Sequence, residues 1–352
     1  MSNCRKQLIA KRSNEVSVAR NLARLLLVPL AGLMLWTGPC DAETTQLIFS
    51  HSGGPGSLYD VTAKEFTRRL DAALPPDFAT VIQGGGTQLG DPVQVLEKLK
   101  RGEVTFGIAS TAMTTMSELF GIFDLPFLIR NREQVRRISK VMLEPVLQPE
   151  VRKYGFRILA IWENGFRHIT NNVRPIRRPE DLKGLKIRVP EGAWRQKVFR
   201  AMGAEPVAMS LREVYDGLKS GVIDGQENPL AQIKGGRFDE VQQFLALSDH
   251  IYTPAYVMVG EEHFAKLPLE VQRAIEKTAA EMQEWVYATA VKMEGELVDR
   301  LGERMQTNQI DSKAFIEASR PLYRDFVQTV PGGAKLVGIV QELAEENSAP
   351  AR

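Results

Sequence analysis

Residues 91–109 read DPVQVLEKLKRGEVTFGIA, and this stretch contains both elements from which the fold is built. Its first half has a carboxylate at a helix N-cap position, a proline in the first turn, and Val95 and Leu99 at helical spacing. Gly102 ends the helix, and residues 104–109 then predict a short buried strand. A helix joined to a strand by a few residues is the repeating unit of α/β proteins.

Similar patterns surround this stretch. Residues 47–50 and 79–83 predict two further strands, and Tyr59, Phe66 and Leu70 recur at helical spacing between them. Strands that alternate with amphipathic helices predict an α/β fold.

The order helix, glycine, strand returns at residues 214–225, where Leu218-Lys219 and Gly221 precede a short apolar run. Ser210 and Glu213 are spaced as a capping box that would start this second helix. Either the chain has two lobes of related construction, or the likeness is a coincidence, because helix–glycine–strand is a common local pattern.

The C-terminal third changes character. Apolar residues recur at helical spacing from Pro268 to Met305 without an internal proline, which predicts one helix about 50 Å long. Gly295 and Gly302 lower the local helix propensity and could mark bends. Such a helix would bridge two lobes; a coiled coil is the alternative, but sustained heptads are absent.

Composition excludes several classes of protein. The chain has 352 residues, 43% of them hydrophobic and 25% charged, enough for two soluble domains, and a net charge of +2 does not suit a nucleic-acid binder. The four histidines are scattered, and the two cysteines, Cys4 and Cys40, both lie near the N-terminus. We therefore expect no metal site.

The first 42 residues predict an export signal. Basic residues precede the uncharged run 25–38, which is too short to span a bilayer comfortably. The small residues Cys40 and Ala42 then lie at the −3 and −1 positions of a cleavage site after Ala42. An uncleaved N-terminal anchor is the alternative. Removal of residues 1–42 would leave a chain without cysteine, as suits a protein of the bacterial periplasm.

Catalytic and cofactor motifs are not found. The glycine-rich run 84–90 has the wrong spacing for a dinucleotide or phosphate loop and indicates a plain connection between strand and helix. Residues 43–352 contain no GxSxG, HExxH or CxxC sequence. We expect no cofactor and no catalytic residue, so the protein is not expected to be an enzyme.

Two arginines stand out. In residues 185–190 (LKIRVP) the apolar side chains share one face of a strand, so Arg188 points to the other face. Arg167 lies among aromatic and amide residues in 162–172. A guanidinium in a cleft binds a carboxylate through two parallel hydrogen bonds, although an arginine taken alone is more often a solvated surface residue.

A polar loop follows the second helix–strand unit. Residues 224–229 read DGQENP, and the amides of Gln226 and Asn228 could complete a small-ligand site or could simply cap a turn.

At these segments the chain resembles the solute-binding proteins of tripartite ATP-independent periplasmic (TRAP) transporters, over essentially all of residues 43–345. The resemblance implies a two-lobed α/β periplasmic binding protein fold with a cleft between the lobes and a long helix that spans both. The expected boundaries are 43–165 plus 253–292 for lobe I and 166–252 plus 293–352 for lobe II. The motifs that carry the resemblance are QLGD (88–91), DLPF (124–127), NGFRHITN (164–171), LKGLKIRVP (182–190), MGA (202–204), EVY (213–215) and GVIDGQENPL (221–230).

The resemblance also implies site residues. Arg188 matches the family's arginine that pairs with the ligand carboxylate, Arg167 matches a second arginine, and Asn228 matches the cleft asparagine. His51, Ser110 and Leu211 match cleft-lining positions that vary with the ligand.

Two of these cleft positions disfavour one ligand. Ser110 and Leu211 depart from the glutamate and the aromatic residue of sialic-acid-binding relatives, so sialic acid is not the expected ligand. Trp194 adds an apolar wall to the cleft or is a buried core residue.

The function implied is capture of an organic acid and its delivery to small and large integral membrane subunits driven by an ion gradient. The ligand class stays open among C4-dicarboxylates, sugar acids, hydroxy or keto acids and aromatic acids. A periplasmic receptor for a sensor system and a periplasmic enzyme are the alternatives. We expect a monomer, because the tail 344–352 is polar.

Overall fold

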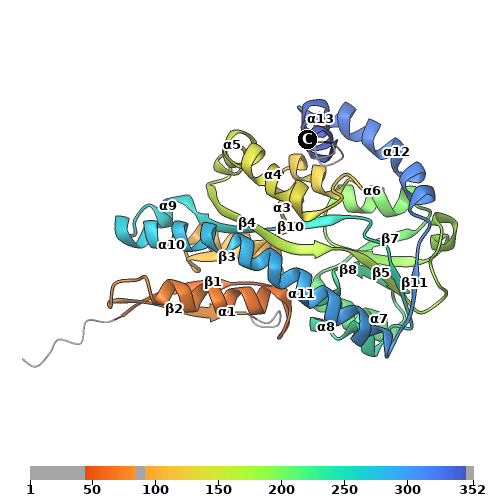
Figure 1. Cartoon of the computed structure of the whole chain (residues 1–352), viewed down its shortest axis with the longest axis horizontal. Helices are drawn as coiled ribbons and strands as arrows, with labels where there is room; N and C mark the ends of the chain where they lie inside the picture. The colour runs from red at the N-terminus through yellow and green to blue at the C-terminus, as the bar shows by residue number, and fades with distance from the viewer. Residues whose placement is uncertain (1–43, 85–91, 346–352) are drawn as a thin grey trace, which may run out of the picture. The chain divides into compact units, whose positions relative to one another are not determined.

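Two mixed β-sheets form the centre of the protein (Figure 1). The computed structural model describes residues 44–84 and 92–345, so the predicted export signal, the 88–91 motif and the chain beyond residue 345 lie outside the described residues. The first sheet has the order β2-β1-β3-β10-β4 and the second the order β11-β9-β5-β8-β6-β7. The strands are β1 (Thr45–Ser50), β2 (Phe78–Gln83), β3 (Phe106–Ala109), β4 (Phe156–Phe166), β5 (His168–Asn171), β6 (Lys186–Val189), β7 (Glu205–Ala208), β8 (Gly225–Asn228), β9 (Phe244–Leu247), β10 (Tyr252–Gly260) and β11 (Gln306–Gln309).

Helices cover both sheets, which confirms the predicted α/β class. They are α1 (Leu58–Asp71), α2 (Pro92–Arg101), α3 (Met113–Met116), α4 (Arg132–Met142), α5 (Gln148–Arg152), α6 (Ala193–Ala201), α7 (Val214–Ser220), α8 (Leu230–Gly235), α9 (Glu261–Phe264), α10 (Leu269–Glu281), α11 (Gln283–Gly302), α12 (Ser312–Thr329) and α13 (Gly333–Glu345). Short 3-10 segments lie at η1 (Glu118–Asp124), η3 (Pro179–Leu182), η4 (Leu211–Glu213) and η5 (Phe238–Glu240), and a π-helical turn at η2 (Leu143–Leu147).

The two sheets share one construction. In the first, β1 pairs in parallel with β2 and β3, and β10 runs antiparallel to β3. In the second, β6 pairs in parallel with β7 and β8, and β5 runs antiparallel to β8. The strand orders β2-β1-β3-β10 and β7-β6-β8-β5 therefore correspond, which favours related construction over coincidence, the two alternatives that the sequence left open.

Two chain segments cross from one sheet to the other. The chain leaves β4, passes through Arg167 and enters β5 of the second sheet. It returns from β9 through residues 248–251 into β10 of the first sheet. The two crossings are joined by a hydrogen bond of 2.9 Å from Arg167 N to Ile251 O, so Arg167 lies between the sheets.

Apolar layers fill both faces of the first sheet. One face packs against α1 and α10 through residues such as Phe49, Phe66 and Ile275. The other face shares a continuous apolar cluster with α2, α4 and α6, to which Val95 and Ile187 belong. This second cluster includes residues of both sheets, so the two halves do not have wholly separate cores.

The long C-terminal helix is present, as α10 followed by α11. Pro268 precedes α10 as predicted, and α11 begins beside α1 and β4 and ends beside α8 (Figure 1). Gly295 lies inside α11 and Gly302 is its last residue, so a bend at Gly295 stays a prediction. Buried Met282 separates α10 from α11 but keeps a helical backbone, since its N donates to the Thr278 carbonyl at 3.1 Å and its carbonyl accepts from Val286 N at 2.9 Å. Beside it, the indole of Trp162 donates to the Ala279 carbonyl at 2.9 Å.

The last two helices lie against elements from both halves. α12 contacts α6, while α13 contacts α4 and η1. The lobe boundaries at residues 165/166, 252/253 and 292/293 stay a prediction. Within the described ranges no helix is both long and apolar enough to span a membrane.

Replacing Gly225 by alanine is expected to destabilise the protein. Its new Cβ would lie 2.2 Å from the Thr170 carbonyl oxygen of the paired strand β5, and backbone cannot give way as a side-chain tip can. Gly295→Ala is the matched control, because open space surrounds that position, and it should raise the free energy of unfolding by about 0.5–1 kcal/mol. Urea denaturation of both variants measures the difference; equal midpoints would show that β8 tolerates the methyl group.

Candidate functional site

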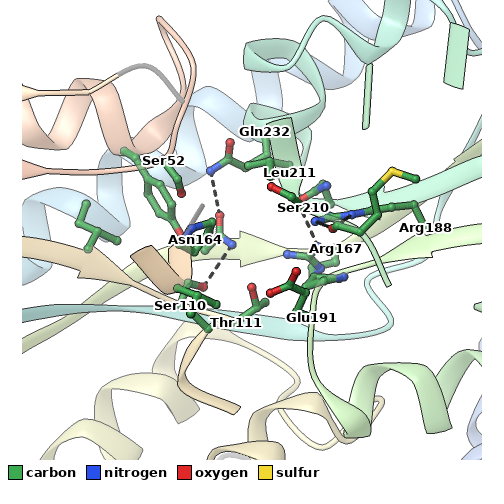
Figure 2. Close-up of a pocket in the computed structure, with 18 residues that line it drawn as sticks. Ser52, Ser110, Thr111, Asn164, Arg167, Arg188, Glu191, Ser210, Leu211 and Gln232 are labelled. Atoms are coloured by element: carbon green, nitrogen blue, oxygen red, sulfur yellow. Dashed lines mark hydrogen bonds between the residues drawn. The ribbon is translucent and has the colours of Figure 1, made fainter. Parts of the chain in front are cut away.

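A cavity lies between the two sheets, at the carboxyl ends of their parallel strands (Figure 2). Ser52 follows β1, Ser110 follows β3, and Arg188 and Asn228 lie at the ends of β6 and β8. The space between the lining side chains, counting the solvent at its open mouth, is about 560 Å³. Ligands of open α/β sheets bind at this end of the strands.

Arg188 reaches the cavity because its neighbours on β6 bury the other face. Ile187 and Val189 are fully buried in the apolar core, so the side chain between them emerges on the opposite side. Its Nε and Nη2 atoms donate to the Met209 carbonyl at 2.8 and 2.6 Å. These two bonds fix the plane of the guanidinium, and Arg188 as a whole is 4% exposed.

Arg167 lines the same cavity from the crossing between β4 and β5. Its Nε donates to the Glu227 carboxylate, and its Nη2 donates to Glu227 Oε1 at 2.9 Å and to Asn228 Oδ1 at 3.0 Å. Within the described part of the chain no hydrogen-bond partner is recorded for Nη1. One edge of this guanidinium is thus held by protein, and the other is available to a ligand.

Glu227 is the centre of a buried network of charges. It accepts from Arg167 and, at 2.9 Å on both oxygens, from Arg195 Nη1, and His250 Nε2 lies 3.4 Å away. Arg195 also donates to Asp124 at 2.5 Å. Burial alone would raise the pKa of Glu227, but the two guanidiniums outweigh it and hold the pKa well below its ordinary range. Glu227 is therefore ionised and neutralises cations that water cannot reach.

The side-chain amide of Asn228 is buried and helps to orient Arg167. Its Oδ1 accepts from Arg167, and its Nδ2 donates to Gln226 Oε1 at 2.6 Å. Gln226 in turn donates to Thr170 Oγ1 at 2.8 Å across the β5–β8 pair. This chain of bonds holds the asparagine amide in one orientation.

The side of the cavity formed by the first sheet carries neutral polar groups. Asn164 Nδ2 donates to Ser110 Oγ at 3.4 Å, and Gln232 Nε2 donates to Asn164 Oδ1 at 3.5 Å (Figure 2). Ser110 itself donates to the Pro254 carbonyl at 2.8 Å. Hydroxyl and amide groups thus lie across the cavity from the arginines in Figure 2.

Five of the predicted residues line the cavity together: Arg167, Arg188, Asn228, Ser110 and Leu211. The other three lie outside its lining. Gln226 lies behind Asn228, as described above.

His51 and Trp194 are the remaining two. His51 is buried directly after β1, and neither ring nitrogen has a partner among the described residues. Trp194 is 1% exposed and packs against Phe326 at 4.9 Å between ring centroids, with Lys197 Nζ 4.2 Å from its ring centre. Trp194 is therefore a buried core residue here, which was the alternative to an apolar wall of the cleft.

Sequence reasoning missed several lining residues, among them Ser52, Tyr59, Glu191 and Ser210. The capping box predicted for Ser210 and Glu213 is wrong: Ser210 precedes the 3-10 turn η4, makes no capping bond, and has a hydroxyl without a partner in the described structure. Ser52 could have been found as the residue that follows β1 beside His51. No local signal marked Tyr59, which lies on a helix whose other apolar residues face the core.

One cluster has the composition of a metal site. His168, Asp249 and Glu294 place their ligand atoms within 4.8 Å of one another. However, His168 Nδ1 accepts from Ser248 N at 3.2 Å, and burial lowers the pKa of His168 to about 3, so the neutral ring carries its proton on Nε2. That nitrogen lies 3.6 Å from Asp249 Oδ1 and has no lone pair to give to a metal.

The chain is similar to known solute-binding proteins along most of its length. The chain matches the family model described as bacterial extracellular solute-binding protein, family 7 (DctP), over residues 49–329. The 2,3-diketo-L-gulonate-binding periplasmic protein YiaO of Escherichia coli is 32% identical over 318 residues, which is 89% of this chain and 96% of that protein.

Solved structures give the same picture. The sugar acid binding protein DctPAm of Advenella mimigardefordensis, in complex with galactonate, is 25% identical with a TM-score of 0.82, covering 86% of this chain and 99% of that chain. A TRAP solute-binding protein of Sulfurospirillum deleyianum with bound succinate is 26% identical with a TM-score of 0.80, covering 85% and 98%. Relatives of similar likeness thus hold a sugar acid in one case and a dicarboxylate in the other.

Glu227→Gln is expected to destabilise the protein strongly, because it leaves two buried guanidiniums with only Asp124 to neutralise them. Removing one partner from a buried ionic network costs about 3–5 kcal/mol. The control is Glu262→Gln, which breaks an exposed ion pair to Lys266 and should leave the urea midpoint unchanged. If the two variants unfolded at the same urea concentration, the ion pairs of Glu227 would contribute nothing measurable to the free energy of unfolding.

Stability should fall as the pH is lowered from 6.5 to 4.5. Burial lowers the pKa of His51 to about 4, against an opposing effect of Asp60, so the folded chain keeps this ring neutral while the unfolded chain protonates it below pH 6.5. His168 behaves in the same way. Each such group contributes a slope of up to about 1.4 kcal/mol per pH unit. Urea titrations of His51→Asn across this window should give a shallower slope than wild type; an unchanged slope would contradict the assignment.

Proposed function

Because this chain belongs to the bacterial extracellular solute-binding proteins of family 7, we propose that it captures an organic acid in the cavity between its two sheets. Proteins of this family are periplasmic receptors of TRAP transport and not enzymes, in agreement with the sequence-based expectation. The observation that carries the proposal for this chain is the pair Arg167 and Arg188, 1% and 4% exposed, which line one cavity from two different strand ends.

The two arginines suit a carboxylate on physical grounds. A carboxylate removed from water needs a paired cation and hydrogen-bond donors, and charge-assisted bonds from guanidiniums supply both. Met209 holds Arg188 and Glu227 holds Arg167, so little side-chain freedom is left to lose on binding. Asn228 acts in this proposal by orienting Arg167, and Gln226 by holding Asn228.

The roles of the remaining predicted residues belong to the proposal as well. Ser110 and Leu211 line the cavity beside the carboxylate site, and neither offers the glutamate or aromatic ring expected for sialic acid. Participation of His51 and Trp194 would require a movement that brings them into the lining.

Transport requires a change of shape and a partner. We propose that closure bends the two crossing segments at Arg167 and at residues 248–251, and that the closed receptor docks on small and large TRAP membrane subunits. The export signal at residues 1–42, a periplasmic location and a monomeric state complete the proposal. Genes for such subunits beside this one would support transport over a sensor role.

A thermal-shift screen against organic acids tests the proposal. Ligand at a hundredfold its Kd stabilises by about 2.7 kcal/mol, which is a shift of a few degrees for a chain of this size. Arg188→Ala should abolish the shift, since truncating a buried charge partner costs about 2–5 kcal/mol. Asn228→Ala should weaken binding less, by about 1–3 kcal/mol.

The control is Arg68→Ala, which removes an arginine that is 68% exposed and should leave binding intact. Full affinity in Arg188→Ala would refute the proposal that Arg188 binds the carboxylate of the ligand. A loss in Asn228→Ala equal to that in Arg188→Ala would refute the ranking.

A further inference from the structure

We infer that the acid bound in this cavity has one carboxylate and carries hydroxyl groups, two of which are bound by Tyr59 and Ser210. This inference rests on the proposed function and names the ligand class of the same site.

Two hydroxyls in the cavity lining have no partner. Tyr59 is 3% exposed and Ser210 is 7% exposed, and neither side-chain oxygen has a hydrogen-bond partner within residues 44–84 and 92–345. Ser110 lies near enough to Tyr59 to affect its pKa but not in hydrogen-bond geometry. A buried hydroxyl without a partner is costly, and a ligand hydroxyl, which both donates and accepts, would satisfy either one.

The two hydroxyls face the cavity from different halves of the molecule. Tyr59 lies on α1, which packs against the first sheet. Ser210 follows β7 of the second sheet and is the next residue after Met209, whose carbonyl holds Arg188. A ligand whose carboxylate binds the arginines can therefore place one hydroxyl against Ser210, beside Arg188, and another against Tyr59, across the cavity.

A second carboxylate is poorly accommodated. Among the described lining residues the cationic side chains are Arg167 and Arg188, and residues 85–91 (GGTQLGD) contain no lysine or arginine. Glu191 adds a carboxylate to the lining. Because both arginines bind the first carboxylate in the proposed function, a second anionic group of the ligand would be desolvated without a further cation and near the carboxylate of Glu191, which discriminates against it.

The other polar groups of the lining suit hydroxyls as well. Asn164 bonds Ser110 and Gln232 at 3.4 and 3.5 Å, which are long distances for hydrogen bonds. Shorter bonds to ligand hydroxyls can replace them without leaving an amide unpaired.

The experiment compares acids that differ only in these groups. Two matched sets are measured by calorimetry on the purified protein: erythronate, butyrate and succinate with four carbons, and gulonate, hexanoate and adipate with six. The hydroxylated acid of at least one set is expected to bind at least tenfold more tightly than both other members of that set.

Two variants then test whether Tyr59 and Ser210 bind ligand hydroxyls. Tyr59→Phe and Ser210→Ala should each weaken binding of the hydroxylated acid by roughly three- to tenfold and leave that of the unsubstituted acid unchanged. The matched controls are Tyr256→Phe and Ser50→Ala, which remove buried, unpartnered hydroxyls outside the lining and should leave every affinity unchanged.

The outcomes separate this inference from the proposed function. Equal or tighter binding of the unsubstituted acid or the dicarboxylate overturns the inference and leaves the receptor function standing. The inference is also overturned, with the receptor function left standing, if another class of organic acid binds and neither hydroxylated acid does. The same holds if the Tyr59→Phe and Ser210→Ala variants bind the hydroxylated acid as tightly as wild type. Failure of every organic acid in the wider screen overturns both.

Discussion

The buried contact between Glu227 and two arginines is the interaction on which the site depends. Arg167 lies at a point where the chain crosses between the sheets, where an unpaired guanidinium would be prohibitively expensive. Glu227 makes that position tolerable and at the same time sets the orientation of the side chain, while Arg195 and Asp124 extend the alternation of charge into the surrounding core. The network is therefore both a condition for folding and the frame of the binding site.

The same arrangement explains why the cavity lies where it does. Both sheets present the carboxyl ends of their parallel strands to it, and each strand end contributes a polar residue that the apolar core cannot take. The crossing segments bring the two ends together, and α11 connects the apolar layer beside α1 with the cluster around α7 and α8. Polar groups from both sheets thus meet around one cavity, and a ligand that contacts both sheets favours the arrangement in which these groups are closest.

Periodicity was enough to predict the α/β class and the long helix, but it left open whether the two halves are related. The resemblance to TRAP solute-binding proteins pointed to five residues that line the cavity. Neither could predict contacts that depend on tertiary packing. Ser210 and Glu213 have the spacing of a capping box, yet the chain turns at η4 and directs the serine into the cavity. The hydrogen bond from Trp162 to the Ala279 carbonyl of α10 could not be predicted either, because the two residues lie more than a hundred positions apart in the chain. Arg195 was missed because its partners, Asp124 and Glu227, come from distant segments.

The loop around Met209 has a consequence for the evolution of this protein. One backbone carbonyl fixes Arg188, and the next side chain faces the ligand, so substitutions that reshape the loop alter affinity and selectivity together. The side of the cavity formed by the first sheet has no such linkage, because Ser52, Ser110 and Thr111 follow strand ends that hold no arginine. Homologues that acquire new ligands should therefore diverge first at those three positions, while the Met209 loop changes slowly.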